Sequence, residues 1–299
     1  MAQNRWPGLQ TQPQPQLQPQ PQPGYRGRRW LRTLVIGLIL FILAALVLLW
    51  TDNPNLFPTV ILIGNFLVPV VFVAFLYDHQ HISSLSLDTV AASFCIGGVL
   101  GVLGAAVIES LVIPAPSNPT QGLSLGGAFL VALIEEGCKI AAVILLARKI
   151  HHTSQMDGLL LGGAVGMGFA ALESTGYAFS ALLISHGHIS ASIASTVLRG
   201  LLAPFGHGVW TGILGAVLFR ESGPRHFRIS GLVILAYLFV SALHTLWDGL
   251  PVTLYFTIPP GIPLPLTSLI LGIIGLIVLT ILYRGAISRQ RQQMPLPMP

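Results

Sequence analysis

Apolar runs of about twenty residues recur along almost the whole of this 299-residue chain. That is the length an α-helix needs to cross the hydrocarbon core of a bilayer, which is about 30 Å thick. Charged residues make up only 8% of the chain and its mean hydropathy is +0.75. Since soluble domains carry about 25% charged residues, this chain could not cover a water-facing surface. The sequence predicts an all-α, polytopic membrane protein and excludes a soluble or disordered one.

We expect about eight membrane-spanning helices, which together form a transmembrane bundle over residues 31–285. Their expected ranges are 32–50, 57–77, 89–113, 123–147, 158–183, 191–218, 229–250 and 266–284. The QPQPQ repeat near the start predicts a disordered, Gln/Pro-rich cytoplasmic tail over residues 1–30, because such a composition cannot form a packed core. Residues 286–299 are expected to form a short basic and Pro-containing cytoplasmic tail.

The basic residues predict the orientation of the bundle, because Lys and Arg accumulate in the cytoplasmic loops of membrane proteins. With the N-terminus inside, every basic residue falls in an inner segment except Lys139 and Arg199, which lie within spans. Both termini are therefore expected in the cytoplasm. The net charge of +5 does not indicate nucleic-acid binding, because the basic residues are scattered between apolar runs. Cys95 and Cys138 lie in apolar segments and imply no disulfide framework.

Small residues at four-residue spacing mark the fifth and sixth expected spans, and such ladders let helix backbones approach closely in lipid. Gly158, Gly162 and Gly166 lie in the fifth span, and Gly208 and Gly212 in the sixth. We therefore expect these two helices at the crowded centre of the bundle. Pro204 is expected to kink or break the sixth helix just before a polar position.

Ionisable side chains occur deep inside four of the expected spans, where each costs about 2.5–3.5 kcal/mol on insertion scales. They are Glu135, Glu136, Lys139, Glu173, Arg199, His207, His244 and Asp248. A rise of about 1.5 Å per residue places the acids and imidazoles at a common depth, so they are expected to converge on one site. Glu109 lies near the outer end of the third span, from which it could reach the membrane interface.

The spacing of these residues narrows the chemistry. Glu135 and Lys139 are four residues apart, which favours an ion pair along one helix face. His244 and Asp248 have the same spacing, so the pair could chelate a metal, or the carboxylate could orient the imidazole. Glu, His and Asp are the ligands and bases of a zinc-type hydrolytic centre, although no H-E-x-x-H motif is present. A structural ion pair, a hydrogen-bonded core histidine at His207 and a packing pair are the alternatives.

Three ordered motifs resemble those of the PrsW-type intramembrane proteases, relatives of the CAAX prenyl endopeptidases in the wider CPBP group. LIEEGCKIAA contains E-E-x-x-K, GMGFAALES contains F-x-x-x-E from Phe169 to Glu173, and HTLWD contains H-x-x-x-D from His244 to Asp248. The segment GHGVWTG, with His207, resembles an additional histidine-bearing helix of the family. The resemblance covers roughly residues 120–250.

The resemblance implies a role for each matched residue. Glu135 and Glu136 would carry the activating glutamate function, with Lys139 holding one of them. Glu173 would share water activation or bind metal. His244 and Asp248 would bind metal or stabilise an oxyanion, and His207 would be an extra ligand. The metal would be zinc or another divalent ion, and a metal-free centre in which glutamate activates water stays open.

We therefore expect an intramembrane peptidase that cleaves a membrane-protein or peptide substrate in or near the lipid bilayer. The plasma membrane of a prokaryote is the expected location, and no motif fixes the oligomeric state. One alternative is a proton- or ion-coupled transporter, which should show inverted repeats that the sequence lacks. A second alternative is a non-catalytic membrane scaffold that keeps the family fold.

Overall fold

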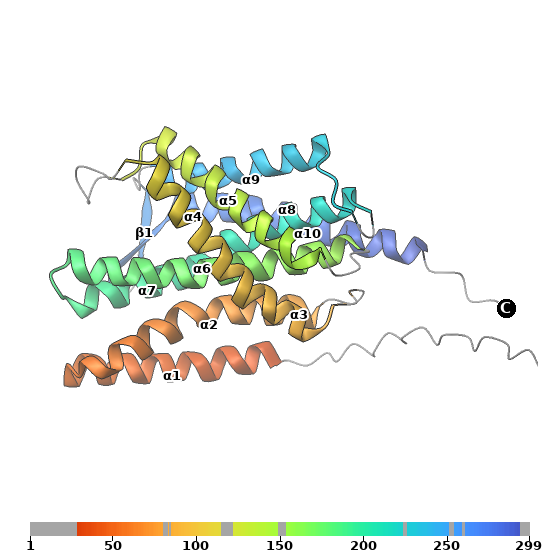
Figure 1. The fold of residues 1–299 in the computed structure, drawn as a ribbon. Coiled ribbons are helices and arrows are strands. Elements are labelled where there is room, and N and C mark those ends of the chain that lie inside the picture. Colours follow the sequence, from red (N-terminus) through yellow and green to blue (C-terminus); the bar gives the residue numbers. More distant parts are fainter. Residues whose placement is uncertain are drawn as a thin grey trace, which may run out of the picture.

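The fold is described from a computed structural model, which covers residues 29–79, 83, 85–114, 122–148, 154–223, 226–250, 254–258 and 261–293. The expected N-terminal tail lies outside this part of the chain except for its last two residues, where the first helix begins. The helices are α1 (Arg29–Thr51), α2 (Phe57–Asp78), α3 (Leu87–Ala92), α4 (Gly98–Val112), α5 (Leu125–Ala147), α6 (Gln155–Ile184), α7 (Ile189–Leu202), α8 (His207–Glu221), α9 (Gly231–Gly249) and α10 (Leu266–Gln293). They form an all-α bundle (Figure 1).

The helices account for the eight expected spans. Within the described residues, seven helical stretches are long and apolar enough to cross a membrane, counting α3 with α4 and α7 with α8 as single stretches. The eighth is α5, which is 23 residues long and has three charged side chains within five residues of its middle, Glu135, Glu136 and Lys139. Figure 1 shows the start of α1 and the end of α10 at the same end of the bundle. An even number of spans requires this arrangement.

Serine side chains begin three of the spanning helices. Ser124, Ser154 and Ser230 each accept a hydrogen bond from the backbone N–H three residues further on, at the starts of α5, α6 and α9. A hydroxyl in this position satisfies one of the amide groups that the first helical turn leaves unpaired. At the other end of the chain, α10 continues to Gln293, so residues 286–293 of the expected C-terminal tail are helical. Arg289 of α10 donates a hydrogen bond to Gln155 at the start of α6.

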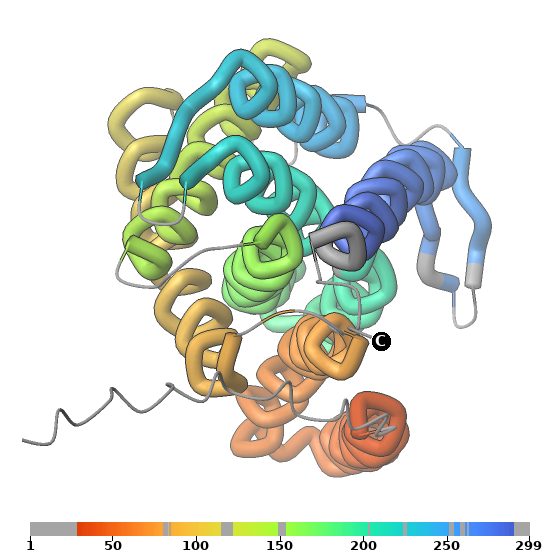
Figure 2. The backbone as a smooth tube through the Cα atoms, turned by 90° about the vertical axis from the view of Figure 1, so that its right-hand side faces the viewer, coloured from red at the N-terminus to blue at the C-terminus, as the bar shows by residue number. Residues whose placement is uncertain are grey.

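A seam of glycines joins α6 to α8 at the centre of the bundle, where Figure 2 places these two helices side by side. A Cβ atom added to Gly162 would lie 2.2 Å from the carbonyl oxygen of Thr211, and one added to Gly166 would lie 2.3 Å from that of His207. Only hydrogen fits at these positions. The expectation that the glycine ladder brings two helices into close contact is therefore confirmed, and this seam fixes the position of the residues that begin α8.

The sixth expected span is broken, as Pro204 predicts. Helix α7 ends at Leu202, a short 3-10 turn follows over Ala203–Phe205, and α8 begins at His207. Proline removes a backbone donor and clashes with the preceding turn, so the α-helical ladder stops there. As a result, His207 is the first residue of a new helix rather than a residue in the middle of a long one.

A two-stranded hairpin between α9 and α10 is an element that the sequence did not predict. β1 (Tyr255–Ile258) pairs antiparallel with β2 (Ile262–Pro265), with Phe256 opposite Leu264. The turn contains Gly261 at φ +122°, a backbone conformation that favours glycine. Figure 2 shows the hairpin at the periphery of the bundle, beside α10.

Candidate active site

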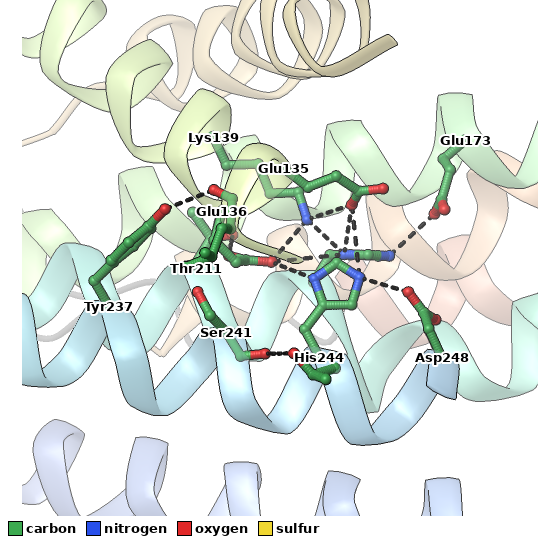
Figure 3. Close-up of polar contacts among 12 residues, drawn as sticks. Glu135, Glu136, Lys139, Glu173, Thr211, Tyr237, Ser241, His244 and Asp248 are labelled. Atoms are coloured by element: carbon green, nitrogen blue, oxygen red, sulfur yellow. Dashed lines mark hydrogen bonds and ion pairs between the residues drawn. The ribbon is translucent and has the colours of Figure 1, made fainter. Parts of the chain in front are cut away.

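The ionisable residues predicted from the sequence converge between α5, α6, α8 and α9. Glu135, Glu136 and Lys139 project from the middle of α5, and His244 and Asp248 project from one face of α9. Figure 3 shows the carboxylates of Glu135, Glu136 and Asp248 turned toward His244. Tyr237 ties the two helices together, because its hydroxyl donates a hydrogen bond of 2.6 Å to the carbonyl oxygen of Leu133.

Lys139 lies at the centre of the cluster and is fully buried. Its Nζ is 3.1 Å from Glu135 Oε2 and 2.8 Å from Glu136 Oε1, so it holds both acids of the motif rather than one. The same ammonium lies 3.9 Å above the centre of the Phe169 ring, a favourable cation–π contact. Burial of these charges in the bilayer is tolerated because each one has a partner.

The two adjacent glutamates are held differently. Glu136 is completely buried, and both of its oxygens are engaged: Oε1 faces Lys139 and His244, and Oε2 accepts a hydrogen bond of 3.2 Å from the Thr211 hydroxyl. Glu135 contacts Lys139 through Oε2, while its Oε1 has no hydrogen-bond partner among the described residues. Glu135 therefore keeps one oxygen available for a further ligand.

His207 joins the acids of α5 to the acid of α6. Its Nδ1 is 2.7 Å from Lys139 Nζ, and its Nε2 is 3.0 Å from Glu173 Oε2. Because an ammonium can only donate, Nδ1 accepts this hydrogen bond and Nε2–H donates to the carboxylate. The break in the sixth span lets α8 begin at His207, so the imidazole lies close to both Lys139 and Glu173.

His244 lies between carboxylates on both sides. Its Nδ1 is 3.2 Å from Glu136 Oε1, and its Nε2 is 3.1 Å from Asp248 Oδ2, so the expected pairing along α9 is present. The Trp210 ring stacks on the imidazole at a centroid distance of 4.8 Å, and Trp247 contacts Trp210 edge to face. With both nitrogens and one face occupied, the ring has little freedom to turn.

Arg199 supplies a second cation from α7. Its guanidinium is 2.5 Å from Glu173 Oε2, donates a hydrogen bond of 2.9 Å to Ser174, and lies 4.0 Å over the Tyr177 ring. Glu173 is therefore shared between Arg199 and His207. The exposed fraction of the side chain is 0% for Lys139 and Glu136, 17% for Glu173 and 29% for Asp248, so the cluster opens on the side of the last two.

A comparison with known protein families agrees with this geometry. The family model described as PrsW family intramembrane metalloprotease matches residues 86–284, two thirds of the chain. The chain belongs to the PrsW family. The matched region extends beyond residues 120–250, which carry the three motifs, and takes in α4 and most of α10. The chain matches no curated protein and no solved structure.

The name of the PrsW family implies a metal, and one group of side chains in this structure could hold one. Glu135, His207 and His244 each offer a ligand atom, and these atoms lie within 4.8 Å of one another. Two imidazoles and one carboxylate are a usual set for a catalytic zinc ion with an open position. The donor types therefore fit a divalent metal. Asp248 lies outside this group and contacts Nε2 of His244. Binding through His207 Nδ1 requires Lys139 Nζ to move away, because both would use the same lone pair.

Some residues at the site were not assigned a role from the sequence. Arg199 was recognised as an intramembrane charge, but its partner on α6 follows only from the packing of α7. Trp210 and Thr211 lie three and four residues after His207 on α8, so helical periodicity could have placed them beside it. Phe169 belongs to the F-x-x-x-E motif, and its ring packs against both Lys139 and His207.

Proposed function

We propose that this PrsW-family protein is an intramembrane peptidase that hydrolyses a peptide bond of a membrane protein or peptide, in or near the bilayer. The observation that carries the proposal is the cluster of acids and imidazoles from four helices, in which Glu135 keeps one free oxygen beside Lys139, His207 and His244. Family membership supports a protease rather than a transporter or a scaffold. We further propose that the protein resides in the plasma membrane of a prokaryote.

Water activation falls to Glu135. The oxygen of Glu135 that has no partner takes a proton from water, and the resulting hydroxide attacks the carbonyl carbon of the substrate. Lys139 and His244 lie on the other side of this carboxylate, and the positive charge of Lys139 stabilises the negative charge that develops on the carbonyl oxygen. The proton then passes to the leaving nitrogen as the C–N bond breaks.

The remaining residues position these groups. Glu136, whose two oxygens are engaged, holds Lys139 and His244 in place, and Asp248 fixes the ring orientation of His244. Glu173 and Arg199 hold His207. A divalent metal, when bound by Glu135, His207 and His244, would supply Lewis-acid activation of the water and the carbonyl group.

The proposal is tested with purified protein in detergent and fluorescently labelled single-span peptides. We expect the wild-type protein to cleave at least one peptide, and Glu135→Gln and His244→Ala to abolish cleavage while the protein stays folded. Asp52→Asn is the matched control, because Asp52 is an exposed residue just after α1, far along the chain from the cluster. Cleavage that persists in both site variants would remove these residues from the chemistry.

A further inference from the structure

Glu109 is a carboxylate beside the cluster that the reaction described above does not use. It lies on α4, and its Oε1 is buried without a hydrogen-bond partner. Within the described part of the chain, the side chain of Glu109 makes no hydrogen bond or ion pair. The carboxylates of the cluster all have at least one N–H partner there, so Glu109 differs from them in kind.

The packing of α4 directs Glu109 toward the cluster. A Cβ atom added to Gly101 would lie 3.7 Å from Cγ of Lys139, and one added to Gly104 would lie 3.4 Å from Sγ of Cys138, so this face of α4 contacts α5. Glu109 follows Ala105, which is 2% exposed, by one helical turn on the same face. Side chains lean toward the N-terminus of their helix, and α4 and α5 run in opposite directions, so Glu109 and Glu135 lean toward each other.

The electrostatic neighbours of Glu109 are the residues of the site. Its carboxylate interacts electrostatically with Glu135, Glu173, Lys139 and His244. Among the described residues, no cation forms an ion pair with it: Lys139 is held between Glu135, Glu136 and His207, and Arg199 is held by Glu173. Glu109 is therefore an acid at the edge of the site that faces groups committed to other partners.

The charge balance of the assembly favours a cation at this position. Five carboxylates face two permanent cations, Lys139 and Arg199; the carboxylates are Glu109, Glu135, Glu136, Glu173 and Asp248. With all five carboxylates ionised, protonation of both imidazoles still leaves one negative charge, and so does a divalent metal bound to neutral imidazoles. In a medium of low dielectric constant, such an excess attracts a positive group strongly.

We propose that Glu109 is a specificity-determining residue, which binds a cationic group of the substrate, an ammonium or guanidinium, next to the site of hydrolysis. The cation comes from a Lys or Arg side chain or from a free α-amino group. This inference rests on the proposed peptidase function, because the cation belongs to the peptide. Glu109 touches the substrate but takes no part in the proton transfers assigned to Glu135.

Binding to defined peptides tests the proposal directly. The probes are fluorescent peptides with one apolar twenty-residue segment, which carry Lys, norleucine or Glu at one of five successive positions at its end. A second pair has a free or an acetylated N-terminus, which separates the two sources of the cation. Binding is measured by anisotropy in a Glu135→Gln background, so that peptides stay intact. At the best position we expect the Lys peptide to bind at least about tenfold more tightly than the norleucine peptide.

Variants of Glu109 give the decisive comparison. We expect Glu109→Gln to remove the preference for Lys, Glu109→Lys to shift it toward the Glu peptide, and Asp52→Asn to leave it unchanged. A preference for Lys that survives Glu109→Gln would overturn the proposal, and so would equal binding of all three peptides by the parent protein. If the protein with Glu135 intact cleaves no peptide but shows the Glu109-dependent preference, the peptidase function fails and the cation site stands. If it cleaves all peptides at equal rates, the peptidase function stands and the cation site fails.

Discussion

At the scale of single residues, the two adjacent glutamates of α5 are expected to behave differently. Glu135→Gln should abolish peptide cleavage with little change in stability, because one oxygen of Glu135 is free. Glu136→Gln should reduce both, since a buried Lys139 loses its closest carboxylate and breaking a buried pair costs about 3–5 kcal/mol. Thermal unfolding in detergent and cleavage rates measure the two effects. Equal losses of stability in both variants would contradict the assignment.

A metal bound through Nδ1 of His207 would compete with Lys139 for the same lone pair. Lys139→Met removes the ammonium but keeps an unbranched side chain of similar length, so we expect the variant to retain more zinc than the wild-type protein after desalting. Zinc content is measured by mass spectrometry on the folded fraction. Adding His207→Ala in the same protein should cancel the gain. A lower zinc content in Lys139→Met than in wild type would show that the lysine supports the metal rather than excluding it.

At the scale of elements, the glycine seam between α6 and α8 makes a prediction about stability. Gly162→Val would place a side chain against the Thr211 carbonyl oxygen, where a Cβ atom would already lie 2.2 Å away. We expect a loss of stability of at least about 1–3 kcal/mol, as is typical of overpacking. Unfolding monitored by circular dichroism measures it. Gly126→Val in the first turn of α5 is the control, because no atom lies within 4 Å of a Cβ at that position.

Much of this architecture follows from local sequence patterns. Apolar runs predict the spans, the spacing of Gly158 and Gly162 predicts the close pair of helices, and Pro204 predicts the break before α8. The position of a residue along its helix predicts its depth in the membrane, and it places His207 and Glu173 at a common depth. The face on which each residue lies against a neighbour depends on helix packing, so the partner of Arg199 could not be predicted.

Two further features, the hairpin and the surroundings of Glu109, could not be predicted from the sequence. The hairpin of β1 and β2 contains Pro263 and Pro265 and only four residues per strand, so no alternating pattern long enough to predict a strand exists. Glu109 was placed near the interface from its position in the span, whereas its relation to Glu135 depends on the rotation of α4 about its axis.

At the scale of the whole molecule, the distribution of basic residues predicts which loops face the cytoplasm. We expect His188→Cys, in the exposed loop before α7, to react with a membrane-impermeant maleimide added outside the cell. Gly223→Cys, in the exposed loop after α8, should react only after permeabilisation. Both substitutions are made in a protein without Cys95 and Cys138. Labelling of Gly223→Cys in intact cells would reverse the predicted orientation.

The contact between Gly166 and the carbonyl oxygen of His207 couples the architecture of the bundle to its chemistry. The backbone that carries the bridging imidazole rests directly on α6, with no side chain between them to absorb a displacement. A substitution that widens this spacing moves His207 away from Glu173 of α6 and changes its distance from Lys139 of α5. We therefore expect the glycines of this seam to tolerate substitution least, although they contact no substrate.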